Sequence, residues 1–407
     1  MPYYTYWQKS KITGCLFVLF LIYLQLNYYY FAMQDFHAGL YIKQGTYKSF
    51  QPSLINRDWV LNDMHVMKLL SQADRHLGRL DMYSQYVNID MFIKMHIAKE
   101  ATQSSRIEGT QTNIEDVFLK KDEIKTENRN DWEEVHNYVN AMNEAVLLLH
   151  RLPFSSRLIK NTHKILLQGV RGEHKMPGEF RKSQNWIGGA SINDAVFIPP
   201  VHTTINELMS DLEKFANDEF IQLPDLIKIA LIHYQFETIH PFLDGNGRVG
   251  RLLITLYLVD KKILKRPILY LSDFFEKNRS LYYDNLMRVR TNNDINQWLK
   301  FFLTGVMETA KKGVETFDGI MQLQKNIDLK LKEIGSRSGD AYKIVEYLYN
   351  QPIIDAQSIS AITGKSLRPS YNMISVLERL EIIREITGAQ RGKLYLFSDY
   401  VNLFKTE

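Results

Sequence analysis

The chain has 407 residues, which is too long for one ordinary compact core and predicts two or three domains. Apolar residues make up 45% and charged residues 24%, as in soluble globular proteins, and a net charge of +4 is too small to imply nucleic-acid or membrane binding by itself. The single cysteine, Cys15, excludes an intrachain disulfide and a thiolate zinc cluster. This cysteine usage fits a reducing, cytoplasmic compartment.

The first 33 residues differ in composition from the rest of the chain. Two lysines precede an apolar run at 15–24, the outline of a signal peptide, but no small residue stands three before a cleavage site near Ala32. Residues 12–33 are also long enough for a membrane-spanning helix, which two polar residues weaken. We favour a third interpretation, in which 1–33 is an extension that adds nothing to the fold, with a membrane anchor as the second choice.

The region from 34 to 312 predicts a mainly α fold. Residues 34–119 predict a loop and then helices, and apolar positions at helical spacing predict helices over 62–80, 89–108, 132–149, 157–168, 205–215, 225–238, 248–261, 280–290 and 295–312. Glycines and prolines interrupt this pattern at 169–200, where 184–187 and 195–198 predict a small β-hairpin. We therefore expect a helical core at 120–312 with a β-hairpin flap.

The last part of the chain predicts a separate small unit. Residues 313–339 predict a linker helix that ends in a Gly- and Ser-containing linker at 335–339. Residues 340–407 predict three short helices, at 341–349, 355–362 and 370–380, and two strands, at 382–385 and 393–397. Three helices followed by a β-wing indicate a winged helix-turn-helix domain.

The loop at 240–251 concentrates chemical groups between two apolar helices. Gly245-Asn246-Gly247 at a helix start leaves backbone N–H groups free to bind phosphate oxygens. Arg248 and Arg251 share a helix face and can both reach a polyphosphate. A carboxylate beside phosphates suits Mg²⁺, which indicates Asp244 as a ligand, and His240 can act as a general base towards a hydroxyl.

Two other interpretations of this loop fail. Gly245, Gly247 and Gly250 form a literal G-x-G-x-x-G pattern, but the preceding segment has helical periodicity and no βαβ unit follows, which excludes a dinucleotide fingerprint. A simple tight turn between helices would not require two arginines, a histidine and an aspartate in so few positions.

Residues 240–251, His-Pro-Phe-Leu-Asp-Gly-Asn-Gly-Arg-Val-Gly-Arg, match the Fic-domain signature H-P-F-x-(D/E)-G-N-G-R-x-x-R at every defined position. The resemblance extends over about 113–304, including Pro177-Gly178-Glu-Phe-Arg181 and Phe197-Ile-Pro-Pro200. It implies a Fic-type protein adenylyltransferase, in which His240 deprotonates a Ser, Thr or Tyr hydroxyl of a target protein. The hydroxyl then attacks the α-phosphorus of ATP, and pyrophosphate leaves.

The same resemblance implies roles for further residues. Asp244 would hold Mg²⁺ and Arg251 the γ-phosphate. Tyr282 and Tyr283 match positions that flank the adenine, and their pattern fits two aromatic residues of the core equally well. The full ATP site expected from it is Gly245, Asn246, Gly247, Arg248, Val249, Gly250, Arg251, Tyr282 and Tyr283. The flap at Ala195, Val196, Phe197 and Ile198 would add a strand to an extended target segment. The adenine-side asparagine of the family has no clean counterpart, because its place falls near Arg290 or Asn292.

Residues 104–109, Ser-Ser-Arg-Ile-Glu-Gly, resemble the inhibitory pattern (S/T)-x-x-x-E-(G/N) of the same family. A carboxylate at a helix end can pair with a guanidinium elsewhere, and pairing of Glu108 with Arg251 would block the γ-phosphate. An ordinary surface glutamate before a helix-ending glycine is the alternative. We expect an N-terminal inhibitory helix that carries Ser104 and Glu108.

Other functions are weaker predictions. Phosphate transfer, as in Doc-like relatives, is disfavoured because those proteins usually carry lysine where this chain has Arg248. A DNA-binding regulator would use the winged unit, but 370–380 lacks a basic stripe. A role of that unit in protein interaction or in homo-oligomer formation is at least as well supported.

Overall fold

The computed structural model describes residues 36–86 and 89–405, and it is mainly helical, as the sequence predicts. The α-helices before the C-terminal unit are α2 (Met64–Tyr86), α3 (Asp90–Ile107), α4 (Arg129–Leu149), α5 (Ser156–Leu166), α6 (Ile205–Asn217), α7 (Asp225–Ile239), α8 (Asn246–Asp260), the short α9 (Ser272–Lys277), α10 (Arg279–Asn292) and α11 (Ile295–Lys332). Short 3₁₀ turns, η1 (Asp116–Phe118), η2 (Lys121–Glu123) and η3 (Thr126–Asn128), join α3 to α4, and η4 (His202–Thr204) precedes α6.

The predicted extension at 1–33 lies outside the described residues, and so does the anchor predicted at 12–33. Across the described ranges 36–86 and 89–405, no helix is long and apolar enough to cross a membrane.

Helix α7 is the centre of the core. Every residue from Leu226 to Ile239 is buried, which is the pattern of a helix covered on all sides. It packs against α6, α8 and α11, and the Trp298 indole of α11 donates a hydrogen bond of 2.9 Å to the Ala230 carbonyl. Because packing on all sides fixes α7, it also fixes the position of His240, the residue that follows it.

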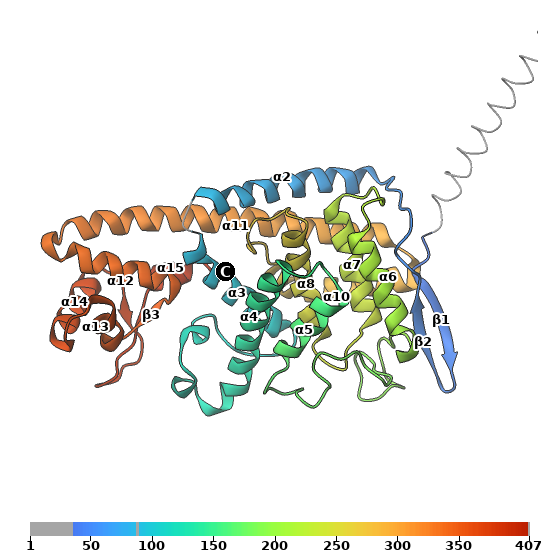
Figure 1. Cartoon of the computed structure of the whole chain (residues 1–407), viewed down its shortest axis with the longest axis horizontal. Coiled ribbons are helices and arrows are strands. Elements are labelled where there is room, and N and C mark those ends of the chain that lie inside the picture. Colours follow the sequence, from blue (N-terminus) through green and yellow to red (C-terminus); the bar gives the residue numbers. More distant parts are fainter. Residues whose placement is uncertain (1–35, 87–88, 406–407) are drawn as a thin grey trace, which may run out of the picture.

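Helices α2 and α11 lie side by side along the length of the molecule (Figure 1). The sequence predicts two helices, one over 295–312 and a linker helix within 313–339, but α11 is one continuous helix of 38 residues. The role of Gly313 lies in a contact with a distant segment, because a Cβ atom there would lie 2.8 Å from Leu80 Cδ1 of α2. Gly313 therefore allows the close approach of two helices and does not break one.

A regular hairpin lies near the start of the described chain, where the sequence predicts only a loop. Strands β1 (Gly39–Gln44) and β2 (Tyr47–Pro52) pair antiparallel around Gly45, whose φ is +60°. The hairpin predicted at 184–198 is reduced to a single antiparallel bridge between Ile187 and Phe197. The two segments meet, since the Phe50 amide of β2 donates to the Ile198 carbonyl at 2.9 Å, so β2 supports the flap.

The C-terminal unit lies at the opposite end of the molecule from this hairpin (Figure 1). It contains α12 (Ser338–Asn350), β3 (Ile353–Ile354), α13 (Ala356–Thr363), α14 (Leu367–Arg379), β4 (Arg384–Glu385), β5 (Tyr395–Leu396) and α15 (Ser398–Asn402), with an antiparallel sheet of order β3-β5-β4. The linker predicted at 335–339 is instead a turn, η5 (Gly335–Arg337), and the start of α12. The three predicted helices and two predicted strands are present, and β3 and α15 were not predicted. Assignment to the winged helix class stays a prediction, as do the domain boundaries.

Candidate functional site

The loop at 240–245 connects the buried helices α7 and α8. His240 caps α7 with φ +50° and ψ +60°, a left-handed conformation that costs energy for a residue with a Cβ atom. The Arg181 guanidinium, only 2% exposed, supports it by donating to the His240 carbonyl at 3.0 Å and to the Pro200 carbonyl at 2.6 Å. This buried arginine satisfies carbonyls that the end of α7 leaves open and fixes the position of His240.

His163 and Asn246 hold the remainder of the loop. The His163 ring stacks on Phe242 with centroids 3.7 Å apart, and its Nδ1 accepts the Gly178 amide at 2.8 Å. The proton must therefore lie on Nε2, which donates to the Asp244 carbonyl at 3.0 Å. The Asn246 side chain accepts from the Phe242 amide and donates to the Phe242 carbonyl, at 2.8 and 2.9 Å. Its amide thus closes the loop, and a phosphate would meet only its backbone N–H.

A cavity of about 710 Å³ opens beside this loop. Twelve of the predicted site residues line it: Glu108, Val196, Phe197, His240, Asp244, Gly245, Asn246, Gly247, Arg248, Arg251, Tyr282 and Tyr283. The first turn of α8 begins at its wall after Gly245, whose φ is +74°. The first intrahelical hydrogen bond of α8 runs from the Val249 amide to the Gly245 carbonyl, so the backbone N–H groups of residues 246–248 remain available to an anion.

The structure does not bring every predicted residue to the cavity. Val249 is fully buried in the core, and Gly250 faces Glu237 and gives its carbonyl to His233 Nδ1 at 2.9 Å. Contacts of these two residues with a nucleotide are therefore not supported. In the flap, Val196 and Phe197 line the cavity and Ala195 and Ile198 do not; Val196 is 66% exposed.

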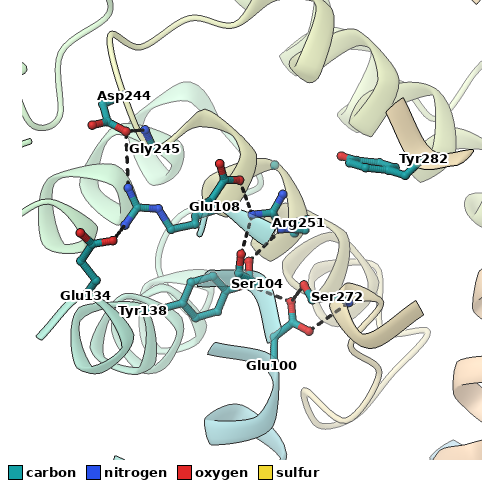
Figure 2. A network of polar contacts seen from close by, with 12 residues as sticks. Glu100, Ser104, Glu108, Glu134, Tyr138, Asp244, Gly245, Arg251, Ser272 and Tyr282 are labelled. Carbon is teal, nitrogen blue, oxygen red and sulfur yellow. Dashed lines mark hydrogen bonds and ion pairs between the residues drawn. The ribbon is translucent and has the colours of Figure 1, made fainter. Parts of the chain in front are cut away.

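Arg251 is held by the last turns of α3. Its Nη2 lies 2.6 Å from Glu108 Oε1 and 2.9 Å from the Ser104 carbonyl, and its Nε donates to Ser104 Oγ at 2.8 Å. In Figure 2, Glu108 points from the end of α3 directly at Arg251. Burial alone would raise the pKa of the Glu108 carboxyl, but the charge and hydrogen bond of Arg251 lower it below 4.5. Burial alone would lower the pKa of Arg251, but the charge of Glu108 leads the interactions that raise it, so both groups stay ionised.

The segment of α3 below this pair is anchored on two sides. Glu100, 2% exposed, accepts hydrogen bonds from the Tyr138 hydroxyl of α4 at 3.0 Å and from the Ser272 hydroxyl of α9 at 2.5 Å (Figure 2). Ser104 lies one turn further along the same helix. This network fixes the helix face that presents Ser104 to Arg251.

Arg248 has a different partner, which the sequence did not reveal. Its Nη1 lies 3.0 Å from Glu134 Oε2 of α4, and the same carboxylate accepts Arg171 at 3.3 Å. Both the Arg248 and Glu134 side chains are almost fully buried. Burial raises the pKa of the Glu134 carboxyl, and the two arginines offset this only in part. Nothing in the sequence around position 134 distinguishes this glutamate from Glu133 beside it, whose side chain is more exposed.

Two glycines of the loop are explained by carboxylates beside them. A Cβ atom at Gly247 would lie 2.4 Å from Glu108 Oε1, and one at Gly250 would lie 2.2 Å from Glu237 Oε1. Both helix positions therefore leave room for a carboxylate against the backbone. Glu237 also lines the cavity, and burial raises its pKa to about 7 despite the nearby Arg251.

His240 and the residues around it set the protonation state of the site. Burial lowers the pKa of His240 to about 3, and the positive charges of Arg181 and Arg290 act in the same direction. Its imidazole is therefore neutral at neutral pH and free to accept a proton. Arg290 lies over the Phe197 ring at 3.9 Å and donates to Thr238, so it forms a wall between the flap and α10. Asn292 is exposed and does not line the cavity.

Tyr282 and Tyr283 differ in what they offer to a ligand. Tyr282 is 1% exposed, and its hydroxyl is 2.9 Å from His233 Nε2, so it belongs to the core as well as to the cavity wall. Tyr283 is 40% exposed and presents its ring at the cavity. Of the two, only Tyr283 has a free face of a size that suits stacking on a base.

The position of Asp244 suits a residue that binds Mg²⁺. Its side chain is 40% exposed, and one carboxylate oxygen, Oδ1, is 3.5 Å from Arg248 Nη2. Oδ2 makes no hydrogen bond among the described residues and lies beside the cavity. The part of the chain that the structure describes holds no cluster of three or more metal-binding side chains. Mg²⁺ in nucleotide sites is commonly bound by one or two carboxylates together with phosphate oxygens of the nucleotide. Asp244 would supply such a carboxylate.

Comparisons with known proteins agree with this geometry. Residues 67–147 match the Fic/DOC family N-terminal domain, and residues 153–258 match the Fic/DOC family domain. A protein adenylyltransferase Fic of Drosophila erecta is 34% identical over 165 residues, which is 40% of this chain and 29% of that protein. A protein of the same name from Aedes aegypti is 34% identical over 125 residues, which is 30% of this chain and 22% of that protein. The matches thus span less than a third of these relatives.

A crystal structure of a Fic family protein from Desulfovibrio desulfuricans G20 has the same fold, with a TM-score of 0.56 at 20% sequence identity. The superposition covers 84% of this chain and 98% of that one. The two segments that match the family domains, 67–147 and 153–258, contain α3, α7, the loop after α7 and most of α8. These elements contribute residues to the cavity. The chain therefore contains the N-terminal and Fic domains of the Fic/DOC family.

Proposed function

We propose that this protein transfers AMP from ATP to a hydroxyl side chain of a target protein. The observation that carries the proposal is one cavity lined by a neutral histidine, a free carboxylate oxygen, a helix N-terminus and two arginines. The relatives named protein adenylyltransferase Fic support it, because each is 34% identical to this chain over the segment that matches.

In this proposal His240 is the general base. The target hydroxyl gives its proton to the imidazole, and the hydroxyl oxygen forms a bond to the α-phosphorus of ATP. The bond from that phosphorus to the bridging oxygen breaks, and pyrophosphate leaves with the electron pair. The low pKa of His240 keeps the ring deprotonated before the reaction. The negative charge of a bound triphosphate then raises this pKa and makes the ring a better proton acceptor.

The other loop residues bind and orient the nucleotide. Backbone N–H groups of 246–248 bind phosphate oxygens, and Arg251 binds the γ-phosphate after it leaves Glu108. Asp244 holds Mg²⁺, which neutralises phosphate charge when it is bound. Tyr283 covers one face of the adenine, and Tyr282 supports Tyr283 from the core. The exposed Val196 on the flap contacts a target segment that binds in an extended conformation.

Glu108 holds the enzyme in a low-activity state. Its 2.6 Å ion pair with Arg251 occupies the guanidinium that the γ-phosphate needs. Because the Glu108 side chain is 35% exposed at the cavity, it can leave without unfolding the core. Ser104 continues to hold Arg251 in place when Glu108 is removed.

Mass spectrometry of target proteins tests the proposal. The Glu108→Gly variant is incubated with ATP, Mg²⁺ and a cell lysate, and the His240→Ala variant serves as the matched control. We expect AMP on Ser, Thr or Tyr with Glu108→Gly and no modification with His240→Ala. A phosphate in place of AMP, or no adduct in any sample, would overturn the proposal.

A further inference from the structure

A second cavity lies behind the last turns of α3, where the C-terminal unit meets the rest of the molecule. This junction groove, of about 490 Å³, is lined by residues of three parts of the chain: Lys99, Gln103 and Arg106 of α3, Glu115 and Asp116 before and within η1, and Arg384 of β4. Phe404 and Lys405, from the end of the described chain, also line it. It is separate from the cavity at the 240–251 loop and shares no residue with it.

The charges of the junction groove do not cancel. Lys99 pairs with Asp273 outside the groove at 3.7 Å, and Lys405 pairs with Glu115 at 2.6 Å. Asp116 accepts the Asn113 amide at 3.1 Å. Arg106 and Arg384 have no carboxylate within ion-pair distance among residues 36–86 and 89–405. Two guanidinium groups from different elements thus face one groove, and neither is paired with the two carboxylates that also line it, Glu115 and Asp116.

A buried polar group in the same groove lacks a partner. Gln103 is 7% exposed, and its Oε1 makes no hydrogen bond within the described chain. A buried acceptor without a donor costs free energy until a ligand supplies one. Guanidinium groups donate to both phosphate and carboxylate oxygens, but only phosphate keeps a proton near neutral pH that Gln103 could accept.

We propose that the junction groove binds a small phosphate-bearing anion between Arg106 and Arg384. Gln103 accepts a hydrogen bond from its protonated oxygen. The bound anion joins the last turn of α3 to the sheet of the C-terminal unit.

The position of Arg106 gives this binding a consequence for Glu108, and this part rests on the proposed function. Arg106 stands two residues before Glu108, in the last turn of α3. The C-terminal unit already contacts this helix through Phe92 against Tyr349 at 5.2 Å and His96 against Phe404 at 4.9 Å. An anion that bridges Arg106 to Arg384 adds a tie nearer to Glu108. It therefore strengthens the Glu108–Arg251 pair and lowers AMP transfer.

Thermal unfolding of the full chain tests binding without reference to any activity. Inorganic phosphate and pyrophosphate are the probes, with citrate as the carboxylate control and no ATP present. We expect a rise in melting temperature of about 3 °C or more at a hundredfold excess over Kd. Arg106→Gln and Arg384→Gln each weaken the apparent affinity about tenfold or more. Arg391→Gln, an exposed change of the same charge outside the groove, retains the full shift.

Three outcomes would overturn the anion site. The first is that phosphate raises the melting temperature equally in all three variants. The second is that citrate raises it as much as phosphate does, through the same arginines, and the third is that a short DNA duplex binds through these arginines while phosphate has no effect. Since neither arginine has an ion-pair partner among the described residues, the unliganded variants should unfold within about 1 kcal/mol of the wild type, which keeps the comparison valid.

The regulatory part has its own measurement. Phosphate should lower AMP transfer by the wild-type chain and leave the rate of Arg106→Gln unchanged. If phosphate binds through the two arginines but even Glu108→Gly transfers no AMP, the proposed function fails and the anion site stands. If transfer occurs and phosphate does not affect it, the regulatory inference fails.

Discussion

Arg248 and Arg251 lie three residues apart on α8, and each is paired with a glutamate from another helix. Arg248 pairs with Glu134 of α4 at 3.0 Å, and the two side chains are 4% and 3% exposed. Arg251 pairs with Glu108 at the end of α3 at 2.6 Å, and here the side chains are 1% and 35% exposed. Both glutamates line the cavity, but only the Glu108 side chain is substantially exposed there.

This difference assigns different roles to the two pairs. Removing Glu134 would leave the buried Arg248 with Asp244, 3.5 Å away and 40% exposed, as its counter-charge, so we assign that pair to the permanent part of the fold. Glu108 follows the last turn of α3 and precedes Gly109, whose φ is +103°. A carboxylate at a helix end beside a cavity can move into water, so that pair can open.

Glu134→Gln should have the largest effect on stability. We expect the free energy of unfolding to fall by about 3 kcal/mol, because Arg248 loses its buried counter-charge. Chemical denaturation measures it, and Glu133→Gln on the same helix, with a more exposed carboxylate, is the matched control. A change under about 1 kcal/mol at Glu134 would mean that this pair is as replaceable as a surface one.

Alanine at the two helical glycines sharpens the contrast. Gly250→Ala places a Cβ atom 2.2 Å from the buried Glu237 carboxylate and 3.1 Å from Phe236, and we expect a loss of about 1–3 kcal/mol. Gly247→Ala meets the end of the Glu108 side chain, which can swing out, so its cost should stay under about 1 kcal/mol. Equal costs, measured by the same denaturation, would show that Glu108 is as fixed as Glu237.

The smallest effect concerns pH. The pKa of Glu108 is lowered from 4.5, so its stabilising charge is fully present above pH 4.5 and is lost only as the pH falls through the lowered folded-state value. The ratio of AMP transfer by Glu108→Gly to that by the wild type should therefore change less than about twofold between pH 6 and 8. A steep fall of this ratio towards pH 6 would indicate that protonation of Glu108 already opens the pair.

Local patterns predicted the parts of the molecule whose chemistry lies within a short segment. The loop at 240–251 and the 104–109 pattern are such segments, and the structure brings Glu108 and Arg251 into contact as expected. The apolar spacing of 225–238 likewise predicts α7 almost to its ends.

The remaining features depend on contacts between distant segments. Glu134 has no local signal, because only the fold places it against Arg248. Gly313 looks like a helix end until α2 packs on it, and the flap forms one bridge because β2 supplies its other support at Ile198. The local pattern around Val249 and Gly250 could not reveal which face of α8 turns away from the cavity.

A double-mutant cycle of AMP transfer tests most directly whether Glu108 acts through Arg251. The rates of the wild type, Glu108→Gly, Arg251→Ala and the double variant are measured with the same ATP, Mg²⁺ and target. We expect Glu108→Gly to raise the rate about tenfold or more, and the double variant to be no faster than Arg251→Ala alone. An equal increase from Glu108→Gly in the presence and absence of the Arg251 guanidinium would contradict the account.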